Sequence, residues 1–113
     1  MNYQPTLDRS FEALSHPVRR AIVSRLVTGQ ATVGEASRGL GISKPAVTKH
    51  VKVLEAAGIV RRSVHGRQHT LELEPSPLHE ASSWLELHRS LWEAKFEVVE
   101  SHLADRREGK EKP

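Results

Sequence analysis

The sequence contains no cysteine and no long apolar run. Without cysteine, the chain cannot form a disulfide, bind a metal through thiolates or use a cysteine nucleophile. No apolar stretch approaches the roughly 20 residues that a helix needs to cross a bilayer. Residues 1–9 also lack the apolar core of a signal peptide. We therefore expect a cytoplasmic protein with no membrane partner.

Signatures of catalysis are missing as well. There is no glycine-rich phosphate loop, no nucleophile motif and no recognisable pair of catalytic carboxylates. The 113 residues suit one domain with a modest core, and they contain no internal repeat or low-complexity tract. An enzyme is therefore the least favoured class, and no cofactor is predicted.

Positive charge is concentrated in the middle of the chain. The whole sequence carries a net charge of only +3. When Lys, Arg, Asp and Glu are counted by segment, residues 1–42 carry +2, residues 43–67 carry +5 and residues 68–113 carry −4. A polyanion would be attracted to the middle segment and repelled by the last one. The middle segment is either a solvated face or a nucleic-acid interface.

Residues 32–58 contain two predicted helices joined by a very short turn. The first begins at a Thr-x-x-Glu capping box, in which Thr32 and Glu35 each satisfy a backbone N–H group of the other residue. Gly39 and Gly41 then give the backbone the freedom for a sharp turn. This spacing predicts a helix-turn-helix.

The second helix of the pair, residues 43–57, has an apolar face and a cationic face. Ser43 is the predicted N-cap, Pro45 fits the first turn, and Gly58 fits a left-handed position after the last turn. Apolar residues at i, i+4 and i+7 should face the core. These are Val47, Val51 and Leu54, and the opposite face carries Lys44, Thr48, Lys49 and Lys52.

A β-hairpin is predicted after this helix, over residues 59–74. Two strand-like segments flank a turn at His65 and Gly66. A helix-turn-helix followed by a hairpin is a winged helix, so the predicted fold is mainly α with a small β-hairpin (α+β), in the order α-α-α-α-β-β-α. Arg67 near the turn either reaches a phosphate or a minor groove, or is exposed to solvent without a role.

Two shorter helices are predicted near the N-terminus. Residues 1–7 should be flexible, the first helix follows Asp8, and the next has Ser15 as its cap and Pro17 in its first turn. The second helix carries three arginines, Arg19, Arg20 and Arg25. We expect them to be largely solvated, with a phosphate contact by one of the first two as the alternative.

A long helix is predicted over residues 76–104, which would complete a domain spanning residues 8–104. It is longer than a domain of this size requires, and one broad face is apolar. That face either covers the chain's own core or packs against a second copy, and we favour a two-fold dimer. The candidate interface residues are Phe11, Leu14, Ala81, Trp84, Leu85, His88, Trp92, Phe96, Val99 and Leu103. Residues 105–113 are charged and should be disordered.

Three motifs together resemble the ArsR-type bacterial winged-helix repressors, over residues 11–103. Residues 13–20 contain the Pro-x-Arg signature of the family's opening helix. Residues 42–58 have the Ser-x-Pro-x-x-x-x-His order of its recognition helix. Gly66 and Arg67, before an alternating strand, are similar to its wing.

The resemblance implies a homodimer that binds a roughly palindromic DNA operator and represses transcription until a signal releases it. The candidate DNA-binding residues are Thr32, Ser43, Lys44, Pro45, Thr48, Lys49, His50, Lys52, Arg62 and Arg67. Lys52 suits a phosphate better than a base, and His50 either presents one edge to DNA or packs against Leu54. The alternative function is a protein-interaction module that does not recognise a DNA sequence, and the cationic face of residues 44–52 argues against it.

The family's sensing chemistry is not expected here. Many members bind metals through a cysteine in the helix before the turn, and this chain has none. Histidines occur on the long helix, but the position eleven residues after His88 is Val99, which departs from the ligand spacing of zinc-sensing members. No metal site is predicted, and no effector is assigned.

Overall fold

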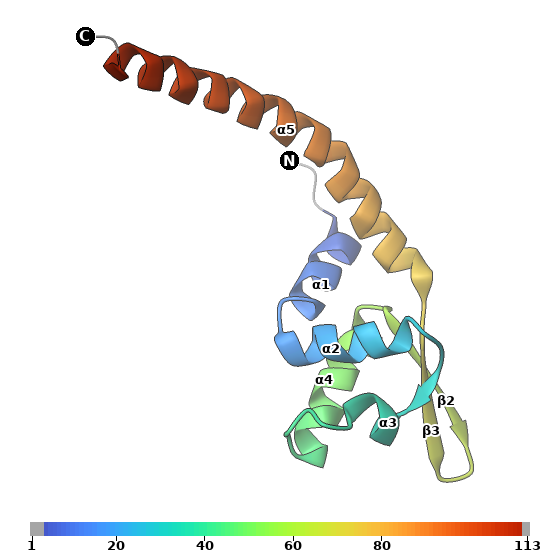
Figure 1. Cartoon of the computed structure of the whole chain (residues 1–113). Helices are drawn as coiled ribbons and strands as arrows, with labels where there is room; N and C mark the ends of the chain where they lie inside the picture. The colour runs from blue at the N-terminus through green and yellow to red at the C-terminus, as the bar shows by residue number, and fades with distance from the viewer. Residues whose placement is uncertain (1–3, 112–113) are drawn as a thin grey trace. The chain divides into compact units, whose positions relative to one another are not determined.

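The computed structural model describes residues 4–111, with side chains over residues 4–106. This part of the chain contains five α-helices and three β-strands (Figure 1). In chain order they are α1 (Pro5–Ala13), α2 (Pro17–Leu26), β1 (Ala31–Thr32), α3 (Val33–Ser37), α4 (Lys44–Ala56), β2 (Val60–His65), β3 (Gln68–Leu73) and α5 (Pro75–Glu111). The chain forms two compact units that divide between Ala81 and Ser82, so α5 contributes to both.

Local capping contacts determine where the two central helices begin. Thr32 Oγ1 accepts a hydrogen bond from the Glu35 N–H group at 3.1 Å, and the Glu35 carboxylate accepts one from the Thr32 N–H group at 3.1 Å. Ser43 Oγ accepts a hydrogen bond from the Ala46 N–H group at 3.3 Å. Gly58 follows α4 with φ at 73°, in the left-handed region that costs glycine least. These contacts confirm the predicted capping box, N-cap and left-handed glycine.

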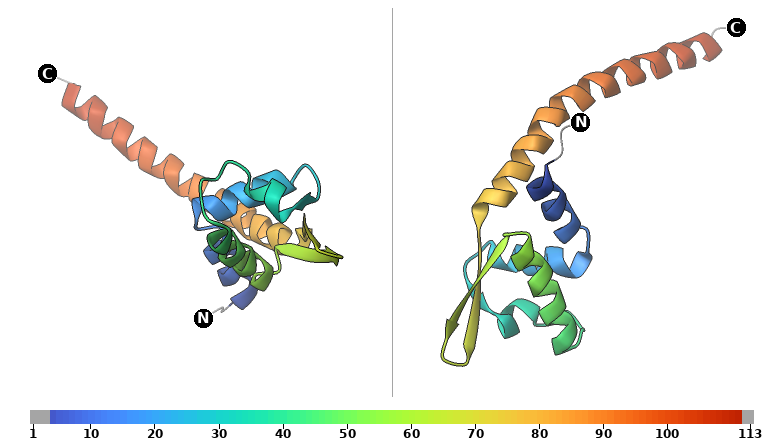
Figure 2. Two further views of the ribbon diagram at one scale, coloured as in Figure 1. Left: turned by 90° about the horizontal axis from the view of Figure 1, so that it is seen from below. Right: turned by 180° about the vertical axis from the view of Figure 1, so that it is seen from behind.

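The predicted hairpin belongs to a three-stranded antiparallel sheet with the strand order β1-β3-β2. Strand β1 was not predicted from the sequence, and its two residues pair Ala31 with Leu71 and Thr32 with Thr70. Because Thr32 is also the N-cap of α3, the sheet positions the start of the helix-turn-helix. Figure 2 shows the hairpin of β2 and β3 beside α3 and α4.

The core of the first unit lies between helices α2 and α4 and the sheet. Ile22 of α2, Leu54 of α4 and Leu71 of β3 are each 0% exposed. Burying such a side chain stabilises the fold by about 1.5–3 kcal/mol. The apolar face predicted for the second helix of the pair is confirmed, because Val47 and Val51 are buried together with Leu54.

The outer ends of the first and last helices differ from the prediction. Helix α1 begins at Pro5 and not after Asp8, since proline suits a first helical turn and Leu7 is buried. Residues 1–3 of the predicted flexible terminus lie outside the described residues.

Helix α5 also extends beyond its predicted limits. It begins at Pro75, one residue early, and continues to Glu111 past the predicted end at residue 104. Residues 105–111 are therefore helical and not disordered, whereas residues 112–113 lie outside the described residues. Arginine, glutamate and lysine have high helix propensity, which explains how a helix continues without an apolar face.

Candidate nucleic-acid interface

The start of α4 presents polar and cationic groups to solvent. Lys44, Pro45, Thr48 and Lys49 are exposed, whereas Val47 is buried on the opposite side of the helix. The first N–H groups of a helix lack helical partners and give that end a partial positive charge. This partial charge adds to the charge of Lys44, so the start of α4 is favourable for a phosphate.

An open groove of about 490 Å³ lies between α3, the start of α4 and the hairpin. It is lined by hydroxyl groups from the helices and by basic side chains from α4 and the strands. Five of the ten predicted DNA-binding residues line this groove: Thr32, Lys44, Thr48, Arg62 and Arg67. The groove therefore brings together candidates from three elements, β1, α4 and β2, and from the hairpin turn.

The groove also contains residues that the sequence analysis missed. Gln68 and His69 line the groove and follow Arg67 directly in the sequence. Their position next to the predicted hairpin turn could have identified them as candidates. Ser37 gave no signal, because a serine within a helix ordinarily faces solvent or bonds to the backbone of the preceding turn. Here its hydroxyl donates to the Val33 carbonyl oxygen at 2.8 Å.

The hairpin turn exposes Arg67 beside this groove. Gly66 adopts φ of 64°, which lets the chain reverse between β2 and β3 without the strain that a side chain would cause. Arg67 follows immediately, and it is exposed. The geometry therefore gives Arg67 the freedom to reach a phosphate.

Arg62, in contrast, is held by contacts inside the protein. Its Nη2 group donates to Glu55 Oε1 at 2.7 Å, and its Nη1 group lies 3.1 Å from His69 Nδ1. The Arg62 side chain is only 22% exposed. The ion pair links α4 to the hairpin and offsets the charge of Arg62, so this residue differs from Arg67 although both line the groove.

His50 lies outside the groove lining and contacts α2. Its Nδ1 atom is 3.2 Å from Arg19 Nη1, and its ring centroid is 4.4 Å from that of His16. Burial, the charge of His16 and the charge of Arg19 all lower the pKa of His50 below its ordinary value. The structure therefore gives His50 two partners that the sequence analysis did not identify.

The arginines of α2 bond to backbone oxygens at the ends of other helices. Arg19 Nε donates to the Ala13 carbonyl oxygen at 2.7 Å, and Arg25 Nη1 donates to that of Ala36 at 2.8 Å. Carbonyl groups in the last turn of a helix have no helical partner, so these contacts satisfy them. The expectation of largely solvated side chains is wrong for Arg19 and Arg25, which are half-buried. Arg20 is exposed, and it donates one hydrogen bond to Leu14 O at 2.8 Å.

The remaining helical candidates keep the exposure that DNA contact requires. Ser43 and Pro45 are exposed at the start of α4, and Lys49 and Lys52 are exposed further along it. None of these four residues is part of the groove lining. Their contact with DNA stays a prediction.

The candidate dimer-interface residues differ in their surroundings. Ala81 is only 4% exposed, which corrects its assignment to an interface, because it is buried within its own chain. Leu14 packs partly against the core of the first unit. Phe11 is half-buried on α1.

Most candidates on α5 are exposed or form an aromatic cluster along the helix. The rings of Trp84 and His88 stack with centroids 4.0 Å apart, and Trp92 meets Trp84 edge-on at 6.1 Å. Exposed apolar side chains from the predicted set are Leu85, Trp92, Phe96, Val99 and Leu103. Leu87, Leu91 and Val98 are also exposed, and the sequence analysis did not include them.

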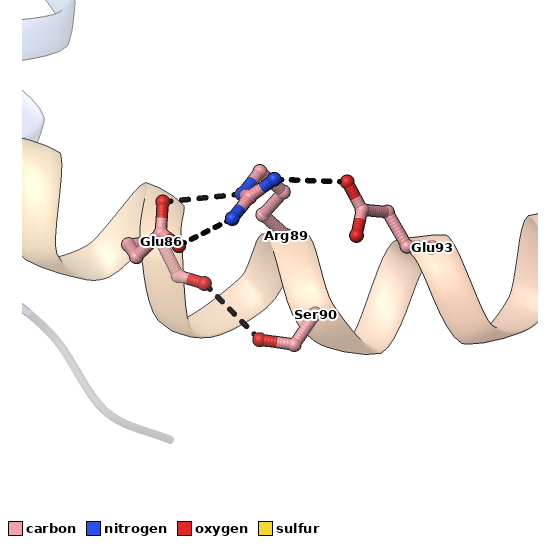
Figure 3. A network of polar contacts seen from close by, with 4 residues as sticks. All are labelled: Glu86, Arg89, Ser90 and Glu93. Carbon is pink, nitrogen blue, oxygen red and sulfur yellow. Dashed lines mark hydrogen bonds and ion pairs between the residues drawn. The ribbon is translucent and has the colours of Figure 1, made fainter.

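Another side of α5 is polar. Arg89 forms ion pairs with Glu86 at 2.6 Å and with Glu93 at 3.0 Å (Figure 3). Ser90 Oγ donates to the Glu86 carbonyl oxygen at 3.4 Å. The helix therefore has one side suited to water and one broad side that exposes apolar surface.

A helix-turn-helix with a cationic second helix, followed by a hairpin in a three-stranded sheet, defines a winged helix-turn-helix protein. A family model described as a helix-turn-helix domain matches residues 14–63. A crystal structure of an ArsR family transcriptional regulator, RHA00566, is 36% identical with a TM-score of 0.73, over 78% of this chain and 97% of that one. The chain belongs to the ArsR family of transcriptional regulators, which are DNA-binding proteins and not enzymes.

Two curated relatives support the same assignment. The HTH-type transcriptional regulator Rv2034 of Mycobacterium tuberculosis is 44% identical over 71 residues, which are 63% of this chain and 66% of that protein. The chain thus spans slightly less than two-thirds of that relative. The transcriptional repressor SdpR of Bacillus subtilis is 28% identical over 79 residues, which are 70% of this chain and 88% of that protein.

The described part of the chain lacks two further features. None of its helices combines the length and the apolar character needed to cross a membrane. Within the same residues, no three histidine, aspartate or glutamate side chains gather in a group that could hold a metal ion.

Proposed function

We propose that this protein is a homodimeric transcriptional repressor that binds a roughly palindromic operator through α4 and the hairpin. The observation that carries the proposal is the groove between the start of α4 and the hairpin, where Lys44, Arg67 and the hydroxyl of Thr48 lie together. DNA supplies the phosphates and base edges that such groups bind. SdpR, a relative, is named a transcriptional repressor, which supports repression over activation.

The exposed side of α4 supplies the groups that distinguish bases. Lys44 and Lys49 can donate to guanine O6 and N7 in the major groove. The Thr48 hydroxyl already donates to the Lys44 carbonyl oxygen at 3.1 Å, which leaves its lone pairs and methyl group for DNA. Thr48 therefore suits a thymine methyl group or a donor on a base.

The exposed apolar side of α5 supports the dimer. Phe96 is 63% exposed and Val99 is 53% exposed, together with other apolar side chains along several turns of the helix. A second copy of the chain would remove this surface from water and would place two copies of α4 on one duplex. Helix-turn-helix dimers generally bind half-sites about one helical turn apart, roughly 34 Å, and we expect the same spacing here. We infer that the protein acts in the cytoplasm.

Comparison of specific and random DNA across a salt series tests the proposal. The full chain is titrated with a duplex from its own promoter region and with a random duplex of equal length, and the protected bases are mapped by footprinting. We expect tighter binding to the promoter duplex, a symmetrical footprint and a steep loss of affinity as salt increases. Equal affinity for both duplexes would contradict sequence recognition and favour the protein-interaction module.

A further inference from the structure

The guanidinium group of Arg19 joins three helices, α1, α2 and the proposed recognition helix α4. Arg19 of α2 donates from Nε to the Ala13 carbonyl oxygen at 2.7 Å and from Nη2 to the Glu12 carbonyl oxygen at 3.0 Å, at the end of α1. Its remaining terminal nitrogen, Nη1, is 3.2 Å from Nδ1 of His50 on α4. The position of α4 relative to α1 and α2 therefore depends in part on this one side chain.

The contact requires a particular form of His50. Arginine is always charged and can only donate, so Nδ1 of His50 must accept and cannot carry a proton. A neutral ring with its proton on Nε2 meets this condition. A protonated ring would place a second positive charge 3.2 Å from Arg19 and would remove the acceptor.

The surroundings of His50 add to this requirement. His16 caps α2 by accepting a hydrogen bond from the Val18 N–H group at Nδ1, at 3.1 Å, and its ring packs on that of His50. The groups that face His50 are therefore His16 and Arg19 from α2, while α1 contributes the two carbonyl oxygens that hold Arg19. Burial and both α2 side chains lower the pKa of His50, in agreement with the neutral form.

We propose that His50 is a positioning residue: its neutral ring holds α4 against α2 through Arg19 for operator binding, and protonation of the ring releases that contact. This inference rests on the proposed DNA-binding function and adds acid sensitivity to it. The expected sign is unusual, because a new positive charge near DNA ordinarily strengthens binding. Here the added charge weakens binding, since it breaks the contact that orients the recognition helix.

Variants of the full chain test the proposal by fluorescence anisotropy with the footprinted operator, from pH 7.5 to pH 5.5 at constant salt. We expect wild type to lose affinity over this range, by less than the roughly tenfold that a histidine of ordinary pKa would give at pH 5.5, because the pKa of His50 is lowered. His50→Asn keeps an acceptor near Nδ1 but does not titrate, so it should bind nearly as well as wild type at pH 7.5 and show a flat profile. His79→Asn is the matched control, an exposed histidine on α5, and it should retain the wild-type profile.

His50→Ala separates positioning from direct contact with DNA. It should bind weakly at every pH, while its plot of log affinity against log salt keeps the wild-type slope, because no phosphate contact is lost. Circular dichroism at each pH verifies that every variant is folded. Recovery of affinity in His50→Asn relative to His50→Ala would show that the acceptor, and not ring volume, is what matters.

Three results would overturn the inference. These are an acid-sensitive profile in His50→Asn, stronger wild-type binding at pH 5.5 than at pH 7.5, and a clear fall in the salt slope of His50→Ala. Failure of the proposed function looks different, because wild type would then show no preference for the operator over random duplex even at pH 7.5.

Discussion

Arginine residues near the recognition helix have two kinds of environment. Arg19 and Arg62 are held by carbonyl, carboxylate or imidazole groups of the protein, whereas Arg67 is exposed beside Gly66. A guanidinium that is already paired adds little net charge for DNA, while an exposed one can replace a counterion on a phosphate. Residue type alone therefore does not identify a DNA contact.

Substitution of the two groove arginines should separate these roles. Arg67→Gln should reduce the magnitude of the slope of log affinity against log salt by about 0.9, the value for one lost phosphate contact. Arg62→Gln should weaken binding with nearly the same slope as wild type, because the ion pair with Glu55 positions the hairpin. Anisotropy titrations at several salt concentrations measure both quantities.

Arg106→Gln provides the control for this comparison, because Arg106 is an exposed cation on α5. It should change neither the slope nor the affinity at moderate salt. If Arg62→Gln reduced the slope as much as Arg67→Gln, Arg62 would be a direct phosphate contact in the bound state.

A buried hydroxyl on α1 offers a separate test of stability. Ser10 is 0% exposed, and its Oγ atom has no hydrogen-bond partner. Ser10→Ala removes an unsatisfied polar atom, so it should increase the free energy of unfolding by up to about 1 kcal/mol. Urea unfolding at one fixed protein concentration measures the change.

Ser24→Ala is the matched control for helix propensity, because Ser24 is an exposed serine within α2. Subtracting its effect leaves the contribution of the buried hydroxyl. A loss of stability in Ser10→Ala after this correction would mean that the hydroxyl makes a hydrogen bond in solution.

At the scale of secondary structure, elements that depend on neighbouring residues were predictable and elements that depend on distant ones were not. The caps at Thr32 and Ser43 rest on contacts three residues apart, which a sequence pattern can reveal. The two-residue strand β1 has no periodicity and exists only because it pairs with β3, about 40 residues later. The same argument applies to His50, whose partner Arg19 is 31 residues away.

The capping box of α3 should respond to acid. The Thr32 N–H group, and then the Thr32 hydroxyl, lower the pKa of Glu35. A carboxylate whose pKa is lower in the folded state stabilises the protein at any pH above the ordinary pKa of that group. This stabilisation is lost as the pH falls through the lowered pKa of the folded state. Between pH 6 and pH 3, the excess stability of wild type over Glu35→Gln should therefore decrease, as measured by urea unfolding.

A Thr32→Ala background provides the control for the capping box. Without the Thr32 hydroxyl, part of the interaction with Glu35 is absent, so Glu35→Gln should have a smaller pH-dependent effect there. An equal pH dependence in both backgrounds would show that the hydroxyl does not contribute.

At the scale of the whole molecule, the proposed dimer determines whether one copy or two copies of α4 and the hairpin bind the operator. The family and the general fold were predictable, because the Ser-x-Pro-x-x-x-x-His order and the hairpin turn are local motifs. The interface was less predictable: Ala81 has the spacing of an interface residue but is buried in its own chain, whereas Leu87 and Leu91 are exposed. Periodicity identifies an apolar side of a helix, not what covers it.

Introduction of a charge on the apolar side of α5 should test the dimer directly. Phe96→Lys places a charge on the exposed apolar side, so it should shift the protein from dimer to monomer in sedimentation equilibrium. Operator affinity should fall by roughly a hundredfold or more, because the second half-site would lose its high effective concentration.

Glu97→Lys is the control, since it adds a lysine at the neighbouring exposed position without removing an apolar side chain. It should remain dimeric and bind the operator with affinity similar to wild type. A dimeric Phe96→Lys variant with normal operator binding would exclude this side of α5 as the interface.

The pairing of β1 with β3 also has a kinetic consequence. Ala31 pairs with Leu71, and the entire helix-turn-helix lies between these two residues in the sequence. The sheet therefore closes a loop of about 40 residues. Such long-range closure slows folding more than helix formation does. We therefore expect α4 to reach its final orientation late, together with the hairpin. A newly synthesised chain would then acquire both parts of its DNA-binding surface in a single cooperative step.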